Sequence, residues 1–173
     1  MLPDPASLRI LSYPAPVLKR RASEVETIDG YVRDVAHRML ELMREAEGVG
    51  LAAPQVGLSW RLFVANSGSD GEPDRVYINP RIEFLPSEMV WREEGCLSLP
   101  GIRAQIRRPE RVTITATDLD GKTFTLTSDG LLARVWQHEF DHLDGTLILD
   151  RMSPIDRLAT RRAVKELVAS GGD

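Results

Sequence analysis

Residues 138–142 read His138-Glu139-Phe140-Asp141-His142, and the interpretation of the whole chain starts from this stretch. In a helix, two histidines four residues apart lie on one face, about one turn apart, where both imidazoles can reach one metal ion. Leu131 and Val135 share that face, so the histidines stand on its apolar side. An unpaired polar group there costs about 1–3 kcal/mol, which a bound metal would offset. We therefore predict a metal-binding helix; the alternative is two core histidines that bond to backbone.

A third ligand must come from elsewhere, because a catalytic metal site normally has three protein ligands and one open position. The metzincin pattern would need a histidine at Ile148. A thermolysin-like carboxylate would have to be Glu166, which has no supporting aspartate four residues on. The remaining candidate is Cys96, the single cysteine, whose thiolate would be a good soft ligand. On its own, the segment around Cys96 favours a small buried apolar filler, which is the commonest role of a free cysteine, so the ligand set stays open at this point.

A small, uncharged segment precedes both of these stretches. It reads Gly48-Val49-Gly50-Leu51-Ala52-Ala53-Pro54-Gln55. Its glycines and alanines suit a chain that runs beside a ligand as an edge, and Gln55 adds one amide donor and acceptor. Tight packing between a helix and a strand would explain the segment equally well.

Taken together and in order, three segments resemble peptide deformylase. They are residues 48–55, Glu94-Gly95-Cys96-Leu97-Ser98, and Gln137-His138-Glu139-Phe140-Asp141-His142-Leu143. The resemblance extends from Ile10 to Pro154. It implies that Cys96, His138 and His142 bind one divalent metal, Fe(II) in cells, with Zn, Ni or Co as substitutes. It also implies an α+β fold, with mixed and antiparallel sheets packed around the metal helix and helices at both ends.

The same resemblance implies an activity, which is hydrolysis of the formyl group from the N-terminal formylmethionine of newly made polypeptides. Glu139 would act as general base and then acid. The Gln55 side chain and the Leu97 backbone N–H would stabilise the negative charge on the formyl oxygen. The expected peptide contacts are the backbone of Val49, Gly50 and Gly95, and a methionine pocket walled by Val49, Leu131, Val135 and part of His138.

Two arginines are further candidates for substrate contact. Arg134 stands where many bacterial family members have an apolar residue in the methionine pocket, although Ala-Arg here resembles another branch that includes organelle enzymes. It either turns to solvent or meets the substrate. Arg103, seven residues after Cys96, is the second candidate.

Hydrophobic periodicity predicts the surrounding elements. Apolar residues from Val32 to Ala46 keep a 3.6-residue period, which predicts a helix over 30–47 that Gly48 stops and whose polar face carries His37. The metal helix should start near Ser128 or Asp129 and end by Gly145. A last helix should start at Ser153, with Pro154 and Asp156 completing its cap. Strands are expected over 61–65, 75–79, 111–116 and 123–126, with a polar loop over 66–74 and a hairpin at 120–121.

Composition limits the remaining possibilities. With 173 residues the chain has room for one domain, spanning 1–173. Its 22 Lys and Arg against 26 Asp and Glu give a net charge of −4, which disfavours a nucleic-acid binder and any specific DNA partner. No segment approaches the ~18 apolar residues of a membrane span, and the N-terminus does not resemble a secretory signal. We expect a cytoplasmic protein without a membrane partner.

The last helix offers a second surface. Arg157, Arg161 and Lys165 form a basic stripe, opposite an apolar stripe of Ile155, Ala159, Ala163 and Leu167. The apolar side should dock on the domain, and the basic side could attach to the ribosome or simply be solvated. Three rival functions stay open: a gluzincin-like protease that uses Glu166, a related N-acyl hydrolase of the same fold, and a non-enzymatic adaptor.

Overall fold

Helices pack on both faces of one end of a five-stranded antiparallel sheet in the computed structural model, which describes residues 1–68 and 73–171. The strand order is β1-β2-β3-β6-β7. On the interior strand β2, Leu62 and Val64 pack with helix α1 (Gly30–Glu45), whereas Phe63 and Ala65 pack with helix α2 (Leu131–Leu143). Successive side chains of a strand point to opposite faces, and a helix covers each face here, so all four residues of β2 are buried. The strands are Gly50–Ala52 (β1), Leu62–Ala65 (β2), Arg75–Phe84 (β3), Val112–Thr117 (β6) and Thr123–Ser128 (β7).

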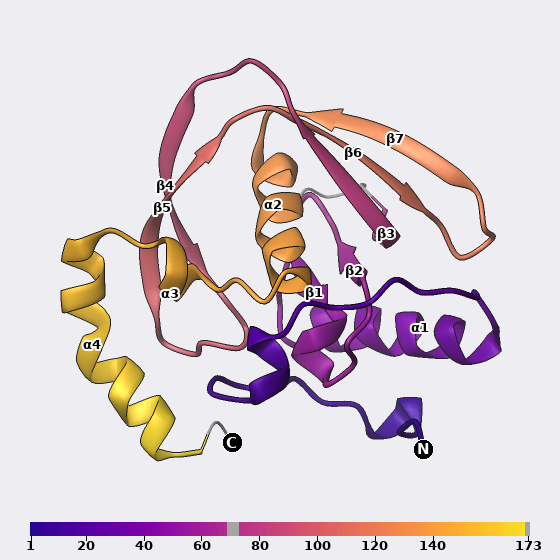
Figure 1. Cartoon of the computed structure of the whole chain (residues 1–173), viewed down its shortest axis with the longest axis horizontal. Coiled ribbons are helices and arrows are strands. Elements are labelled where there is room, and N and C mark those ends of the chain that lie inside the picture. Colours follow the sequence, from indigo (N-terminus) through magenta and orange to yellow (C-terminus); the bar gives the residue numbers. More distant parts are fainter. Residues whose placement is uncertain (69–72, 172–173) are drawn as a thin grey trace.

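A second, two-stranded antiparallel sheet consists of β4 (Met89–Gly95) and β5 (Arg103–Pro109). Its inward positions on β5 are Ala104, Ile106 and Arg108, which alternate with exposed residues. Figure 1 shows α2 in the middle of the molecule, with β4 and β5 on one side and the larger sheet on the other. A third core cluster joins β5 to the short helix α3 (Ile148–Arg151) and to α4 (Pro154–Ala169). Helix α2, which carries His138 and His142, therefore lies between the two sheets.

Helix α2 spans Leu131–Leu143, inside the predicted limits. Neither Ser128 nor Asp129 caps it, because its N-cap residue is Gly130, which provides no side-chain acceptor. Gly145 follows with φ 71°, and a Cβ there would lie 2.7 Å from the carbonyl of Lys19. The predicted stop thus combines a left-handed backbone with a close chain contact that only glycine allows.

The first long helix, α1, spans Gly30–Glu45 and is capped by Asp29, whose carboxylate accepts from the Val32 N–H. Gly48 does not end the helix as we expected; Glu47 adopts the left-handed turn instead, with φ 54°. Position 48 favours glycine for another reason, because a Cβ there would lie 2.9 Å from the Leu97 side chain. His37 is exposed on α1, as predicted.

The four strands predicted over 61–65, 75–79, 111–116 and 123–126 are confirmed, but the pattern missed β1, β4, β5 and α3. Strand β4 carries mostly exposed residues, and β5 places a charged arginine inward, so neither shows simple polar and apolar alternation. A three-residue strand of small residues such as β1 leaves no period to read. Residues 69–72 of the predicted polar loop lie outside the described residues.

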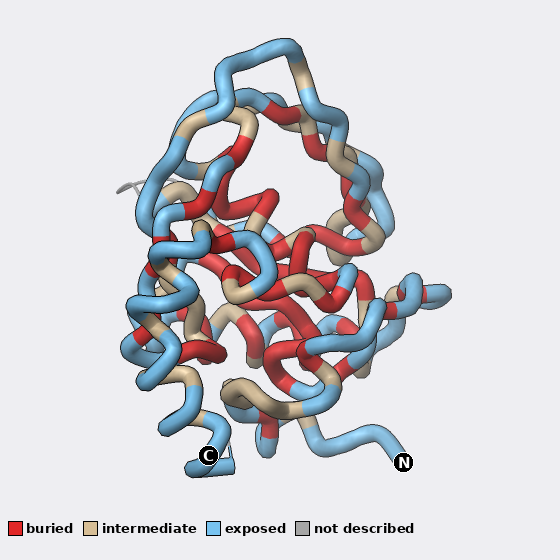
Figure 2. The backbone as a smooth tube through the Cα atoms, turned by 60° about the vertical axis from the view of Figure 1, so that its left-hand side comes forward, coloured by how far each residue is buried: buried red, intermediate tan, exposed pale blue. Residues whose placement is uncertain are grey.

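Helix α4 begins where predicted, with Ser153 as N-cap. The face of α4 that packs on the domain differs in part from our expectation. Ala163 and Leu167 pack on the core as predicted, together with Val164. Ile155, which is 80% exposed, and Ala159, which is also exposed, do not. The cause is Asp156, whose carboxylate accepts from the Gln105 N–H of β5 at 2.9 Å and so turns Ile155 outward. Figure 2 shows α4 as a largely exposed element at the side of the molecule. Within the described ranges, none of the helices has the length and apolar character needed to cross a membrane.

Candidate metal centre and active site

Three side chains from two parts of the fold converge beside α2. Their ligand atoms all lie within 4.8 Å of one another. His138 and His142 project from one face of the helix with their Nε2 atoms 3.3 Å apart, and the Cys96 Sγ lies 3.4 Å from the His142 Nε2. Cys96 follows β4 directly. One thiolate and two imidazoles fit a catalytic metal with one open coordination position, so the residues present suit the metal that the motif implies.

The orientation of His138 is fixed by Glu94. The His138 Nδ1–H donates to Glu94 Oε1 at 3.0 Å, which leaves Nε2 free to face the other two ligand side chains. Burial opposes the charge of Glu94, but hydrogen bonds from His138 and Arg108 outweigh it and hold the pKa of Glu94 well below its usual range. A charged carboxylate that orients a histidine is the usual support of a metal ligand.

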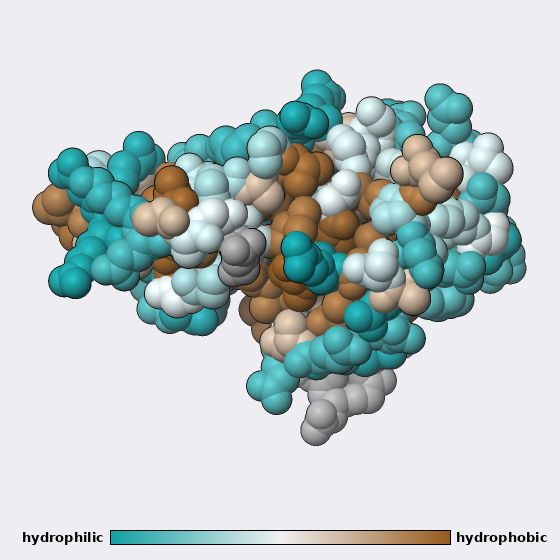
Figure 3. Space-filling view, turned by 90° about the horizontal axis from the view of Figure 1, so that it is seen from below, coloured by the Kyte–Doolittle hydropathy of each residue, from teal (hydrophilic) through white to brown (hydrophobic). Residues whose placement is uncertain are grey.

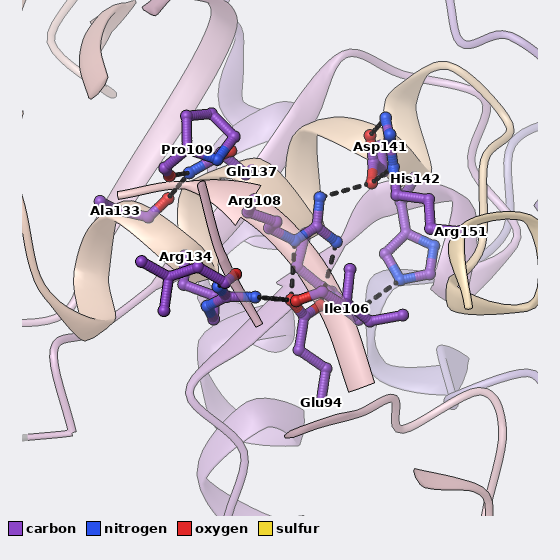
Figure 4. A network of polar contacts seen from close by, with 12 residues as sticks. Glu94, Ile106, Arg108, Pro109, Ala133, Arg134, Gln137, Asp141, His142 and Arg151 are labelled. Atoms are coloured by element: carbon purple, nitrogen blue, oxygen red, sulfur yellow. Dashed lines mark hydrogen bonds and ion pairs between the residues drawn. The ribbon is translucent and has the colours of Figure 1, made fainter. Parts of the chain in front are cut away.

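Glu94 belongs to a network of buried charges (Figure 4). Arg108, only 3% exposed, binds Glu94 through two bonds of 2.7 and 2.9 Å and donates to Asp141 at 2.9 Å. Asp141 also accepts from Arg151 of α3 at 2.7 Å. The network therefore ties β4, β5, α2 and α3 together behind the ligands. The sequence reasoning missed it, although Arg108 at the inward position after Ala104 and Ile106 was a usable signal.

Glu139 stands next to His138, a candidate metal ligand, and is 4% exposed. Burial raises the pKa of Glu139 from 4.5 to about 7, an effect that the nearby His138 partly offsets. Its Oε2 has no hydrogen-bond partner among the described residues. A Cβ on Gly50 would lie 2.5 Å from Glu139 Oε1, so this glycine leaves the space that the carboxyl group occupies. The arrangement suits a proton carrier near neutral pH.

The site opens into a cavity of about 560 Å³. Of the residues that the family resemblance assigns to the active site, all but one line it; the exception is His142, which lies behind the wall and is 1% exposed. Figure 3 shows one face of the molecule, with hydrophobic residues gathered near its middle and hydrophilic residues around them. The lining includes Val49, Gly50, Gln55, Gly95, Cys96, Leu97, Arg103, Leu131, Arg134, Val135, His138 and Glu139.

The amide of Gln55 is locked in one orientation. Its Oε1 accepts from the Ala52 N–H at 2.9 Å, so its Nε2 faces the site, 3.1 Å from Ser98 Oγ and 3.6 Å from Cys96 Sγ. The side chain is 1% exposed. A donor held in place in this way needs no rearrangement to meet negative charge that develops beside the ligands.

Arg134 and Arg103, the two arginines predicted to contact substrate, are both paired with glutamates in the structure. Arg134 does not turn to solvent: it is 8% exposed, and its guanidinium donates to Glu94 at 2.7 Å. Arg103 lies at the rim, where it pairs with Glu93 at 2.7 Å. Glu166 pairs with Arg162 on the exposed side of α4 and lies outside the ligand cluster. The alternative that makes Glu166 a ligand is therefore wrong.

A helix-borne pair of histidines, a thiol, a buried carboxyl and an open cavity together define a metal-dependent hydrolase. Comparison with known proteins narrows the class. The family profile described as polypeptide deformylase matches residues 7–158, and the chain belongs to this family. It is thus an enzyme that removes the N-formyl group from nascent peptides.

Relatives support this membership over most of the chain. The peptide deformylase of Thermodesulfovibrio yellowstonii is 43% identical over 162 residues, which cover 92% of this chain and 98% of the relative. That of Pseudomonas aeruginosa is 42% identical, with 93% and 96% covered. A crystal structure of Plasmodium falciparum peptide deformylase is 38% identical and superposes with a TM-score of 0.88, covering 94% of this chain and 96% of the other. The adaptor alternative is thereby set aside, and the predicted α+β fold is confirmed.

Proposed function

We propose that Cys96, His138 and His142 hold one divalent metal ion, which is Fe(II) in the cell and which Zn, Ni or Co can replace. The convergence of these three side chains beside the buried carboxyl of Glu139 carries the proposal. A site of one thiolate and two imidazoles accepts each of these metals, and the family resemblance favours iron. We infer that residues 1–173 act as one catalytic domain, because the site draws on positions from Val49 to His142.

When bound, the metal lowers the pKa of a water molecule and polarises the formyl carbonyl. Glu139 takes a proton from the attacking water and then passes it to the departing amine. Burial supports both roles, because it raises the pKa of Glu139 from its usual value, to about 7 in the metal-free chain, and so towards neutral pH, where a carboxyl group can accept and release a proton. Gly50 supports the same role by leaving room for the carboxyl group.

The negative charge that develops on the formyl oxygen meets two donors, the Gln55 Nε2 and the Leu97 backbone N–H. Gln55 is already oriented by Ala52, and Leu97 follows the ligand Cys96 in the cavity wall. Removing one such donor typically lowers the rate by ~10²–10³.

The peptide chain of the substrate extends between two strand edges. β1 is the edge of the larger sheet, β4 is paired with β5 in the small one, and Val49, Gly50 and Gly95 bring both into the cavity wall. An extended peptide can therefore add as a strand through backbone hydrogen bonds. Val49, Leu131, Val135 and His138 then wall the methionine side chain, with the methylene groups of Arg134 beside them. Arg103 stands at the rim for a downstream residue.

A Co(II)-substituted protein tests the ligand set. The thiolate-to-cobalt charge-transfer band should be present in the wild type and absent from Cys96→Ser, whose metal content should also fall. A folded Cys96→Ser protein with an unchanged spectrum would remove Cys96 from the site. Ser98→Ala, which alters a neighbouring side chain that is bonded to Gln55, is the matched control.

We also propose that α4 attaches the enzyme to ribosomes, in the cytoplasm, where formylated chains emerge. The basic residues Arg157, Arg161 and Lys165 are all exposed. A surface that holds the enzyme near its substrate raises the effective concentration of nascent chains. The alternative is a solvated charged face.

Replacing Arg157, Arg161 and Lys165 by Glu distinguishes ribosome attachment from a solvated charged face. Turnover of a free formyl dipeptide should be unchanged, whereas co-sedimentation with ribosomes should weaken, most strongly at low salt where charges are least screened. Undiminished co-sedimentation would leave the basic side of α4 without this role.

A further inference from the structure

Arg134 joins the metal helix to the small sheet. It lies on α2 one turn before His138 and is 8% exposed. Its Nη1 donates to Glu94 Oε2 at 2.7 Å and to the Ile106 carbonyl at 3.0 Å, and its Nη2 donates to the Val90 carbonyl at 2.8 Å. Figure 4 shows the guanidinium directed at Glu94. One side chain of α2 therefore binds both strands of the small sheet.

With Arg134 in place, the Glu94 carboxylate makes four hydrogen bonds. Oε1 accepts from Arg108 at 2.9 Å and from His138 at 3.0 Å. Oε2 accepts from Arg108 at 2.7 Å and from Arg134 at 2.7 Å. A carboxylate offers about four acceptor sites, so the group is saturated and cannot rotate without losing a bond. The two arginines thus fix the oxygen that orients His138.

The metal site is assembled from the same two parts that Arg134 joins. Cys96 follows β4, whereas His138 and His142 belong to α2, so the distance between thiol and imidazoles depends on how the small sheet sits against the helix. We propose that Arg134 is a positioning residue of the metal centre: it holds Glu94 against His138 and the small sheet against α2, and thereby sets the binding geometry. This inference rests on the proposed metal site.

Although the side chain lines the cavity, the hydrogen bonds of its guanidinium go to Glu94 and to the carbonyls of Ile106 and Val90, so its donors are directed at the small sheet and not at substrate. Two roles compete with positioning: contact with substrate through the methylene groups of the side chain, and a purely structural role. A structural role would lower stability and leave the affinity of the folded protein for metal unchanged. A positioning role changes the metal affinity itself, because partners of metal ligands typically contribute 10- to 100-fold.

The test compares Arg134→Met with Arg61→Met in the full chain. Methionine keeps an unbranched stem beside the cavity and removes the donors. Arg61 is a matched control, since it is 9% exposed and donates to the Leu143 carbonyl at 3.1 Å and to Asp144 at 2.9 Å, at the far end of α2. Metal affinity is measured by competition between Co(II)-loaded protein and a chelator, at a temperature where each variant is folded. A third variant, Arg134→Lys, restores one donor.

We expect Arg134→Met to bind Co(II) ~10- to 100-fold more weakly, with an altered thiolate-to-cobalt band. Arg61→Met should lose stability with unchanged affinity, and Arg134→Lys should recover part of the loss. Unchanged affinity in Arg134→Met with a raised KM would make Arg134 a substrate contact and overturn the inference. Equal loss of affinity in both methionine variants would also overturn it, as a general structural effect. A wild type that binds no Co(II) would instead refute the proposed metal site.

Discussion

Replacing Glu139 by Gln removes a carboxyl group that burial makes unfavourable when it is charged. The pKa of Glu139 is raised from 4.5 to about 7 in the folded chain. Between these two values the unfolded chain has lost the proton and the folded chain still holds it, so the free energy of unfolding falls as pH rises and levels off above about 7. At about 1.4 kcal/mol per pH unit, the loss is on the order of 3 kcal/mol.

The assay is urea unfolding of the metal-free protein, freed of metal by chelation, at several pH values from 4.5 to 8. Glu139→Gln should lack this loss, so its stability relative to wild type should rise by about 3 kcal/mol across the range. Glu166→Gln, which changes an exposed carboxyl, should follow the wild type. A bound cation would attract the carboxylate and shrink the effect, so the metal-loaded protein should show a smaller difference.

Turnover completes this test. In the metal-loaded protein, Glu139→Gln should keep its metal and lose ~10²- to 10⁴-fold in kcat, because Gln cannot carry the proton. Two results would refute the reasoning. If stability of the variant falls with pH as steeply as that of the wild type, burial of Glu139 is not the cause. If metal is lost in parallel with activity, Glu139 serves the ligand set and not proton transfer.

Other predictions follow from single contacts. Gly50→Ala would place a Cβ 2.5 Å from Glu139 Oε1, so kcat should fall ~10²-fold by steady-state assay while metal content stays unchanged. Gln55→Glu keeps the shape of the side chain but cannot donate, and kcat should fall ~10²–10³-fold; retained activity would exclude Gln55 as a donor. Gly145→Ala should destabilise the fold by about 1–3 kcal/mol in urea unfolding. This loss of stability should be larger than that of Gly121→Ala, because Gly121 has a similar φ of 79° but no atom within 4 Å of the added Cβ. Equal losses would show that the contact with Lys19 adds nothing.

Several elements could be predicted because they follow local rules. His138 and His142 are four residues apart, so both side chains project from the same face of a helix. The period of the apolar residues was therefore enough to predict α2 and the direction of its two histidines. Ser153 caps α4 through the Asp156 N–H, which is a contact between near neighbours in the sequence. The apolar strands around Phe63 and Ile114 were likewise predicted from their residue types.

What could not be predicted depends on contacts between distant parts of the chain. The alternation in β5 could place Arg108 inward but could not identify its partners; charged residues such as Glu94 and Asp141 are usually exposed, and the fold was needed to show that they neutralise Arg108 in the interior. The docked side of α4 likewise depends on contacts with distant residues, which are the bond between Asp156 and β5 and the packing of Val164 on the core. For Cys96, the local segment was compatible with a packing role, and the family resemblance was needed to associate it with the histidines.

The most direct test of the central claim is release of formate from formyl-Met-Ala by the full chain, purified anaerobically with Fe(II) and compared with acetyl-Met-Ala. We predict rapid formate release that is lost in Glu139→Gln, and little or no acetate release, because the reaction uses the metal, Glu139 and a site matched to the formyl group. Equal hydrolysis of the acetyl peptide would indicate the related N-acyl hydrolase. No formate release by protein that carries one Fe(II) per chain would contradict the account.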